Sequence, residues 1–520
     1  MFKLKTVIIL FLFIGISYTI KSQNNVNDFE SLDSYFEKSI SDWTVPGLAI
    51  GIVRNDSLIY AKGFGVKNIN KKAIIDSKTV FPIASNTKAF TAAAIAILVD
   101  EGKLSWDTKV NTILPYFHLY DPYVTQHFTI ADLLSHRSGL KTFSGDLLWY
   151  GTDYTREAVI KKLPLLKQHY EFRTKFGYSN IMYITAGEII AKVSGMSYED
   201  FIKKNILEPL NMNNTYTSIN DLKELDNVCK AHNKVDGKVF PIEFLNWDNI
   251  GGAGILNSNV EDMGQWLKLQ LNNGIWNGDT IFSPRQANEM RTPHTNFSVS
   301  SGYQRIWPST HFKAYALGWS VNDYHGMKVV SHSGGYDGVI TYSCFVPEAN
   351  LGFVILTNSN SSLYNALSYK ILDYFLSNDT TDWSGFFLPY QQRSEKREII
   401  VAKEDAKEPS LSLKKYEGLY KSDLYGNALV KVKGKKMTVQ LLHTKVWEGS
   451  ISKYSADTFI VEFKKIHSLP QGFISFIVNN GEVESFIIDV PNPDFDFTEF
   501  NFKKLTWIEI PQNDVLENKE

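Results

Sequence analysis

The chain has 520 residues, of which 43% are hydrophobic and 21% are charged. This length is too great for one hydrophobic core, so we expect about two globular units and at most three. The formal net charge is only -2, which provides no electrostatic basis for binding nucleic acid; the expected partner is a small molecule or a peptide.

The first residues combine Lys3 and Lys5 with an apolar run from about Val7 to Ile16. This run is short for a membrane span, which needs about 20 residues, so we predict a secretory signal over residues 1–22. The predicted location is therefore the periplasm or outside the cell, with no stable membrane anchor once the signal is cleaved. An uncleaved anchor is the alternative, and the oligomeric state stays open.

Residues 23–387 form the larger predicted unit. Leu48–Asn68 has the pattern of two strands joined by a turn at Arg54–Ser57. Lys88–Glu101 has Ala and Ile on several faces, which predicts a helix that is buried on most sides and ends at Gly102. Further predicted elements are helices at about 182–193, 198–206, 261–271 and 364–376 and strands within 328–347 and 351–358. Strands at both ends of the unit with helices between them predict an α+β domain whose sheet joins its termini.

Ser85 and Lys88 lie one helical turn apart at the front of that buried helix, so their side chains share a face. A serine hydroxyl is a weak nucleophile unless a base or a cation lies beside it, and backbone N–H groups at a helix start can stabilise an oxyanion. A serine that merely caps the helix is the alternative, and it is favoured while this motif stands alone.

A second polar motif follows about ninety positions later, in the stretch FGYSNIMY. Tyr178 is suited to exchange a proton with Ser85 if nearby cations lower its pKa from about 10. Asn180 is suited to donate a hydrogen bond to a substrate carbonyl while it orients Lys88. A packed tyrosine beside a helix cap is the alternative.

The third motif is His332, Ser333, Gly334 and Gly335 in the stretch VVSHSGGYDG. Glycines at a strand end let a substrate backbone approach closely. The adjacent Tyr336 and Asp337 are candidates for the cleft entrance.

Two other groups of polar or sulfur-bearing residues have structural predictions. His136 and Ser138 in LLSHRSGL are assigned to a buried turn rather than to catalysis. Cys229 and Cys344 are far apart in the sequence, and each is expected to be a small buried hydrophobe.

The chain changes character after residue 387. Residues 388–412 include a densely charged stretch and are predicted to be a linker, residues 413–505 a small β domain, and residues 506–520 a tail. Short alternating stretches with turn signals at KGKK and NNGE indicate hairpins in a sandwich or a barrel.

Taken together, SNTK, YSN and HSG resemble the motifs of the serine beta-lactamase and penicillin-binding-protein superfamily. The branch is that of class C beta-lactamases, D-aminopeptidases, DD-carboxypeptidases and related esterases. The stretches LLSHRSGL, GGAGILNSNVEDMGQWL and LGW also resemble this branch, and the resemblance covers about residues 32–375. The C-terminal β domain is similar to a lipocalin-like barrel attached to some family peptidases. The implied fold is beta-lactamase-like, an antiparallel sheet flanked by helices with an all-helical region.

The resemblance implies roles for individual residues. Ser85 matches the nucleophile, Lys88 the general base or its electrostatic partner, and Tyr178 the proton shuttle to the leaving group. Asn180 matches the residue that binds the substrate amide. The oxyanion hole is implied at the backbone N–H groups of Ser85 and Gly335, and the sequence leaves the identity of the base open.

Two positions depart from the family pattern. His332 stands where many penicillin-interacting members have lysine, and a histidine of pKa about 6.5 is mostly neutral near pH 7. Its attraction for a substrate carboxylate should therefore be weaker. The stretch EFRTKFGYSN also lacks a Pro-Gly turn that relatives often have before the tyrosine, which we interpret as a local change.

The sequence thus predicts an exported serine hydrolase that cleaves an amide or ester through an acyl-enzyme, acting on peptides with D-amino acids or on esters. A beta-lactamase, a DD-carboxypeptidase or a penicillin-binding sensor without turnover are the alternatives. No metal or organic cofactor is implied, because HExxH, paired CxxC and a phosphate-binding Gly-Lys-Ser/Thr loop are missing from the sequence. The loops Phe143–Tyr154 and Asn296–Phe312 are expected to shape the pocket.

Overall fold

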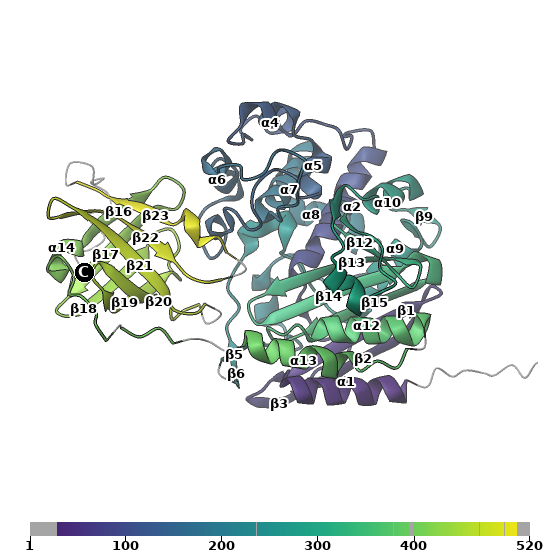
Figure 1. Cartoon of the computed structure of the whole chain (residues 1–520). Coiled ribbons are helices and arrows are strands. Elements are labelled where there is room, and N and C mark those ends of the chain that lie inside the picture. The colour runs from purple at the N-terminus through teal and green to yellow at the C-terminus, as the bar shows by residue number, and fades with distance from the viewer. Residues whose placement is uncertain are drawn as a thin grey trace, which may run out of the picture.

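The computed structural model describes residues 29–506 except 236, 378, 396–398, 403, 467–468 and 493–494. The predicted signal at 1–22 and nearly all of the predicted tail at 506–520 lie outside the described residues. The described residues form a larger α+β unit and a separate β-barrel, which Figure 1 shows side by side.

A nine-stranded sheet is the centre of the larger unit, in the order β10-β11-β12-β13-β14-β15-β1-β2-β3. Its strands are β1 Gly47–Arg54, β2 Ser57–Asn68, β3 Lys71–Ile74, β10 Thr295–Phe297, β11 Lys313–Tyr315, β12 Ser320–Tyr324, β13 Met327–Tyr336, β14 Val339–Val346 and β15 Leu351–Thr357. Each neighbouring pair is antiparallel. β1 pairs with β15, with Ile50 opposite Ile355. This confirms the prediction that the sheet joins the two ends of the unit.

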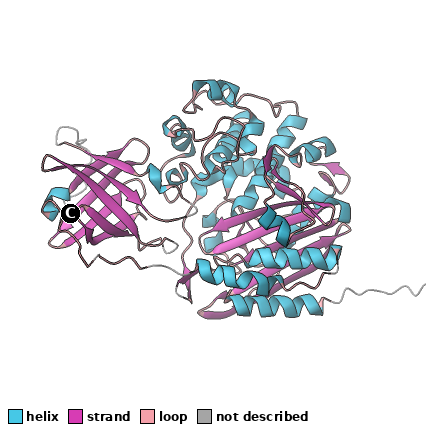
Figure 2. Ribbon diagram, viewed as in Figure 1, coloured by secondary structure: helices cyan, strands magenta, loops and turns pink. Residues whose placement is uncertain are grey.

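Helices cover both faces of this sheet (Figure 2). On one face lie α1 Glu30–Trp43, α12 Leu363–Leu376 and α13 Trp383–Ser394, which share an apolar core with the sheet. On the other lie α9 Val260–Leu271 and α2 Thr87–Asp100. Seven of the eight residues of β1 are buried, as expected for a strand that is covered on both faces.

An all-helical region lies beyond α2 (Figure 1). Its helices are α3 Val110–Ile113, α4 Pro122–His127, α5 Ile130–Leu134, α6 Arg156–Ile160, α7 Asn180–Ser194 and α8 Tyr198–Ile202. The predicted helix at 198–206 is in fact α8 followed by a π-helical turn at Lys203–Leu207, where the hydrogen bonds span one residue more. The other predicted helices are present within a few residues of their expected bounds.

Shorter elements complete the larger unit. They are α10 Pro284–Met290, α11 Ser301–Ile306 and the two-stranded pairs β4 Phe81–Pro82 with β7 Asn257–Ser258, β5 Ala231–Val235 with β6 Lys238–Ile242, and β8 Ile275–Trp276 with β9 Asp279–Thr280. Cys229 and Cys344 are both buried and free, as predicted.

The C-terminal unit is a closed barrel rather than a sandwich. After α14 Leu413–Tyr416 its strands are β16 Gly418–Ser422, β17 Gly426–Lys433, β18 Lys436–Leu441, β19 Glu448–Ser455, β20 Thr458–Glu462, β21 Gly472–Asn479, β22 Glu482–Asp489 and β23 Asn501–Lys504. Strands adjacent in sequence are adjacent in space, and β16 closes the barrel on β23. Aromatic side chains such as Tyr420, Phe476 and Phe486 fill its core.

Helix α13 extends past residue 387, the predicted end of the larger unit. Its Trp383 and Phe387 pack on one another and on Trp307, so this helix belongs to the packing of the larger unit. Among the described residues, no helix is both long enough and apolar enough to span a membrane.

Candidate active site

Ser85 lies in a short turn between strand β4 and helix α2. The β4–β7 pair brings the chain to a single 3-10 turn, Ala84–Asn86, which leads directly into α2. Ala84 has a φ of 46°, a conformation that costs energy for a residue with a side chain and is frequent at functional sites. Ser85 is half-buried, and its hydroxyl makes no capping hydrogen bond. The structure therefore excludes the simple helix-cap interpretation.

Lys88 is fully buried one turn further on, with its ammonium against Ser85. Its Nζ donates to Ser85 Oγ at 2.9 Å, to Asn180 Oδ1 at 2.7 Å and to the Ala253 carbonyl at 2.8 Å. Burial lowers the pKa of Lys88 well below its usual value, although the carboxylate of Asp146 opposes this. A lysine in such a place can lose its proton and act as a base.

Tyr178 and Asn180 come from the segment that leads into α7. The Tyr178 ring centre lies 4.8 Å from Lys88 Nζ, and Asn180 Nδ2 donates to Asp146 Oδ2 at 2.5 Å. Burial raises the pKa of Tyr178, while the neighbouring Ser85 hydroxyl lowers it. The condition set for Tyr178, a pKa lowered by nearby cations, is therefore not met, because removing the phenol from water disfavours its anion more strongly.

His136 packs against Tyr178 and bonds to the residues on either side of it. Its ring centre is 4.3 Å from that of Tyr178, and its Nδ1 accepts a hydrogen bond from the Ser179 N–H at 3.1 Å. The Gly177 N–H donates to the His136 carbonyl. Ser138, whose hydroxyl accepts from the Leu140 N–H, lies in the same buried turn. His136 thus holds the segment around Tyr178, whereas the Ser138 hydroxyl bonds within its own turn.

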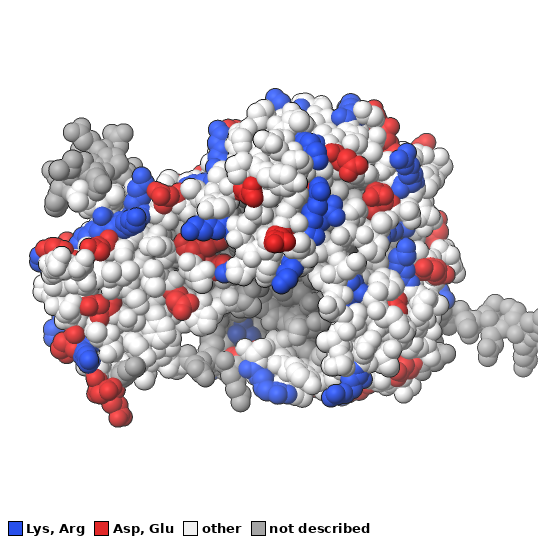
Figure 3. Space-filling view, turned by 45° about the horizontal axis from the view of Figure 1, so that its top comes forward, with Lys and Arg blue, Asp and Glu red and all other residues white. Residues whose placement is uncertain are grey.

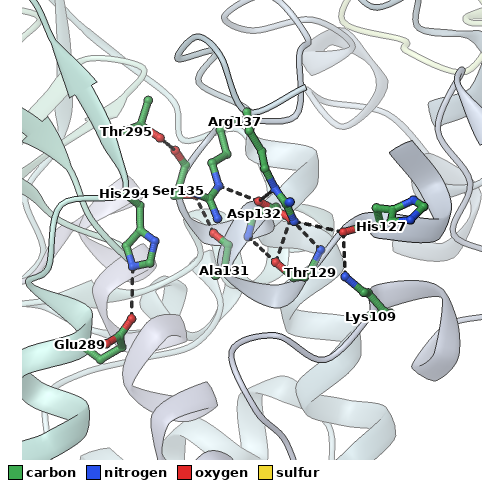
Figure 4. Close-up of polar contacts among 11 residues, drawn as sticks. Lys109, His127, Thr129, Ala131, Asp132, Ser135, Arg137, Glu289, His294 and Thr295 are labelled. Carbon is green, nitrogen blue, oxygen red and sulfur yellow. Dashed lines mark hydrogen bonds and ion pairs between the residues drawn. The ribbon is translucent and has the colours of Figure 1, made fainter. Parts of the chain in front are cut away.

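The buried carboxylate of Asp132 connects helix α5 to the chain that precedes Tyr178 (Figure 4). Asp132 caps α5 through Thr129 and accepts hydrogen bonds from Arg137 at 2.6 Å and from Arg173 at 2.7 and 2.9 Å. Burial opposes its ionisation, but the Arg173 and Thr129 hydrogen bonds and the Arg137 charge together lower the pKa of Asp132. This ion-pair cluster ties the chain just ahead of Tyr178 to α5.

His332 faces the site from β13 and is held as a neutral ring. Its Nδ1 lies 2.6 Å from the Ser333 carbonyl and its Nε2 lies 2.9 Å from the Tyr315 hydroxyl. A carbonyl only accepts, so Nδ1 carries the proton and Nε2 accepts from Tyr315. Burial and the nearby Lys88 lower the pKa of His332 to about 3.

The two glycines that follow have different surroundings. A Cβ at Gly334 would lie 2.1 Å from the Ile83 carbonyl oxygen, so this glycine lets β13 approach the turn that carries Ser85. A Cβ at Gly335 would meet only Ile340, at 3.6 Å. Gly335 is exposed toward the cleft beside Ser85, where its backbone is accessible to a substrate.

These residues line a cleft of about 1010 Å³. Figure 3 shows the molecule hollowed on one face, with positive and negative side chains scattered over that face rather than gathered by sign. The cleft wall includes Phe143, Asp146, Trp149 and Tyr150 from the first predicted pocket loop but no residue of Asn296–Phe312. The second loop was therefore wrongly expected in the pocket; its Trp307 packs on α12 and α13 instead. Tyr336 and Asp337 do line the cleft.

The C-terminal barrel also contributes to the wall, with Pro470, Gln471, Pro491, Asn492 and Phe495. Sequence reasoning missed this contribution, and it missed Asp146, Tyr315 and Glu499. The only local signal for Asp146 is an acidic residue directly before the apolar run LLWY. Among the described residues, no cluster of three or more histidine, cysteine or acidic side chains has the arrangement of a metal site.

Comparison with known proteins agrees with this geometry. A family model described as Beta-lactamase matches residues 32–374, and a model of a domain of unknown function, DUF3471, matches residues 402–504. An unguisins hydrolase from Aspergillus campestris is 29% identical over 423 residues, which is 74% of this chain and 74% of the relative.

Two solved structures are similar in fold. An octameric penicillin-binding protein homologue from Pyrococcus abyssi superposes with a TM-score of 0.61 at 25% identity, over 92% of this chain and 100% of that one. EstCE1, a hydrolase with promiscuous acyltransferase activity, has a TM-score of 0.55 at 20% identity, over 66% of this chain and 96% of its own. The first of these similarities extends across both units of the present chain.

Proposed function

This chain belongs to the beta-lactamase family of serine hydrolases, and from that premise we propose that it cleaves an amide or ester bond through an acyl-enzyme on Ser85. The observation that carries the proposal is the set of contacts around Lys88 Nζ. Asn180 Oδ1 and the Ala253 carbonyl are acceptors only, and together they take both N–H bonds of a neutral amine. When Lys88 loses the proton that it donates to Ser85 Oγ, the lone pair of the neutral amine faces the Ser85 hydroxyl, which is the arrangement a general base requires.

The proton steps follow from these contacts. Lys88 takes the Ser85 proton while Oγ bonds to the substrate carbonyl carbon, and the backbone N–H groups of Ser85 and Gly335 bind the oxyanion. Tyr178, protonated because of its raised pKa, gives its proton to the leaving nitrogen or oxygen and regains one from Lys88. Water then attacks the acyl carbon and gives a proton to the same pair of residues. That proton passes on to Ser85 Oγ as its bond to the acyl carbon breaks, which releases the acid product and restores the Ser85 hydroxyl.

For the substrate we propose a peptide containing D-amino acids, or an ester, rather than a beta-lactam. Burial and the nearby Lys88 lower the pKa of His332 to about 3, so the ring is neutral near pH 7 and this position adds no cation for a substrate carboxylate. The cleft of about 1010 Å³ is at the upper end of small-molecule sites, which run to roughly 1,000 Å³, and has room for a peptide. Export of the protein, through the signal at 1–22, is part of the proposal.

A hydrolysis panel on the purified protein tests this function. The panel contains D-amino-acid amides, D-Ala-D-Ala peptides, short-chain esters and a chromogenic cephalosporin. We expect turnover of a D-amino-acid peptide or an ester, lost in Ser85→Ala and kept in Ser57→Ala, a control at the exposed first residue of β2. A strong preference for the cephalosporin would overturn the argument from His332.

The same experiment separates an enzyme from a sensor. A protein that only senses beta-lactams would form an adduct with the cephalosporin and hold it, with no product released. Rapid release of hydrolysed product from the ester or peptide excludes that alternative.

A further inference from the structure

The loop before Asp146 lies between the barrel and the site, and it is held from the barrel side by Glu499. This glutamate sits at the end of a 3-10 turn, Phe497–Glu499, between β22 and β23. Its carboxylate accepts hydrogen bonds from Ser144 Oγ and from the Gly145 N–H, the latter at 3.0 Å. Tyr425 of the barrel donates to the same carboxylate. One barrel side chain thus binds two consecutive residues of the larger unit.

On its other side the same loop is bonded to Tyr178. The Phe143 N–H donates to the Tyr178 carbonyl at 2.8 Å, and the Tyr178 N–H donates to Thr142 Oγ1 at 3.2 Å. Phe143 has a φ of 64° and Gly145 a φ of 74°. A phenylalanine in this conformation is strained and persists only where its surroundings hold it there. The Glu499 hydrogen bonds are two of the contacts that do so.

Asp146 follows directly and reaches the centre of the site. It is 2% exposed and accepts from Asn180 Nδ2, which fixes Asn180 Oδ1 toward Lys88 Nζ. Burial raises the pKa of Asp146 to about 7. The charged or titratable groups that face it are Lys88 of α2, Tyr178 just before α7, and Glu499 and Tyr425 of the barrel.

We infer that the barrel is a working part of the active site: Glu499 positions the Thr142–Asp146 loop, and Asp146 in turn sets the orientation of Asn180 and Lys88. Glu499 touches neither Ser85 nor a substrate in this role; it is a positioning residue. The inference rests on the proposed function, in which Lys88 is the base. It gives the barrel a task that a separately folded appendage would not have.

The test compares Glu499→Gln with the matched barrel variant Asp489→Asn, an exposed carboxylate on β22. A glutamine keeps one acceptor oxygen but replaces the other with an NH₂ group, so at least one of the three donors loses its partner. Small displacements of catalytic groups cost rates of about 100-fold. We expect Glu499→Gln to lower kcat by about 10- to 100-fold with KM little changed, and Asp489→Asn to match the wild type.

A second variant covers the case in which Glu499→Gln folds poorly. Ser144→Ala removes one hydrogen bond and no charge, so we expect a smaller fall in kcat in the same direction. The readout that a purely structural role would not move is the pH profile. In Asp146→Asn the carboxylate that raises the pKa of Lys88 is gone, so the acidic limb of kcat/KM should shift to lower pH. Unchanged kcat in both Glu499→Gln and Ser144→Ala would overturn the inference.

Acylation kinetics separate the failure of this inference from the failure of the proposed function. A serine-directed ester probe should label Ser85 in the wild type and label it more slowly in Glu499→Gln. Absence of Ser85 labelling in the wild type contradicts the proposed function. Labelling at the wild-type rate in Glu499→Gln contradicts only the role of Glu499.

Discussion

Lys88 Nζ lies 2.9 Å from Ser85 Oγ, and the lysine side chain is fully buried. Its remaining partners, Asn180 Oδ1 and the Ala253 carbonyl, are both acceptors. The site therefore holds an amine whose charge is disfavoured by burial directly beside the candidate nucleophile.

Lys88→Met removes the base and leaves an apolar chain of similar length. General-base catalysis is worth about 100- to 10,000-fold, so kcat on the best substrate of the panel should fall by that factor. Lys78→Met, at an exposed position, is the control for a lost lysine. If Lys88→Met turned over at the wild-type rate, Lys88 would have no part in proton transfer.

The two glycines of β13 should differ sharply on substitution. Gly334→Ala places a Cβ 2.1 Å from the Ile83 carbonyl oxygen, a clash with backbone, so we expect a marked drop in melting temperature and in kcat. Gly335→Ala meets only Ile340 at 3.6 Å, so its melting temperature should stay close to that of the wild type. Equal destabilisation by both would show that packing around β13 differs from the present account.

Asp132→Asn should destabilise the protein in a pH-dependent way. Asp132 is buried, but Arg137 and Arg173 are 19% and 42% exposed, so loss of the charged hydrogen bonds should cost about 1.5–3 kcal/mol of unfolding free energy. The pKa of Asp132 is lowered in the folded state, so its stabilisation is present above the ordinary value of about 4 and is lost as pH falls through the folded pKa. Denaturant unfolding should therefore show a large difference from the wild type near neutral pH and a smaller one in acid. A difference that stayed constant with pH would contradict the role of the ionised carboxylate.

His332 should contribute to the acid sensitivity of the fold. Its pKa is about 3 when folded and about 6.5 when unfolded. The unfolded chain binds more protons between these values, so stability rises with pH across that window. His332→Gln should flatten this slope, whereas His118→Gln, at an exposed position, should leave it as it is. Unfolding free energies measured at several pH values would test this, with an unchanged slope in His332→Gln as the contrary result.

Much of the fold is present in local patterns. The burial of β1 and α2 follows from apolar residues on most of their faces. The hairpin turn could also be predicted, because Asn55 and Asp56 are residue types that tolerate the positive φ that both adopt there. Pairing between β1 and β15 joins residues some three hundred positions apart; it was expected only because strands occur at both ends of the unit.

The site residues also fall into those that motifs predicted and those that only the structure revealed. Ser85, Lys88, Tyr178 and Asn180 were named from motifs, and the structure brings them together around one ammonium. Asp146 was missed because an acidic residue beside LLWY does not reveal that its side chain will bond to Asn180. Glu499 was missed because it belongs to the barrel and its partners Ser144 and Gly145 belong to the larger unit. The spacing of residues within one segment does not predict a contact between two units. The raised pKa of Tyr178 could not be predicted from the sequence, because burial is a property of the packed site.

The most direct measurement is mass spectrometry of the protein quenched during turnover of an activated ester, followed by peptide mapping. The account predicts a transient acyl adduct on the peptide that contains Ser85, absent in Ser85→Ala and accumulating less in Lys88→Met. An adduct on a different residue, or full turnover by Ser85→Ala, would contradict the assignment of Ser85 as the nucleophile.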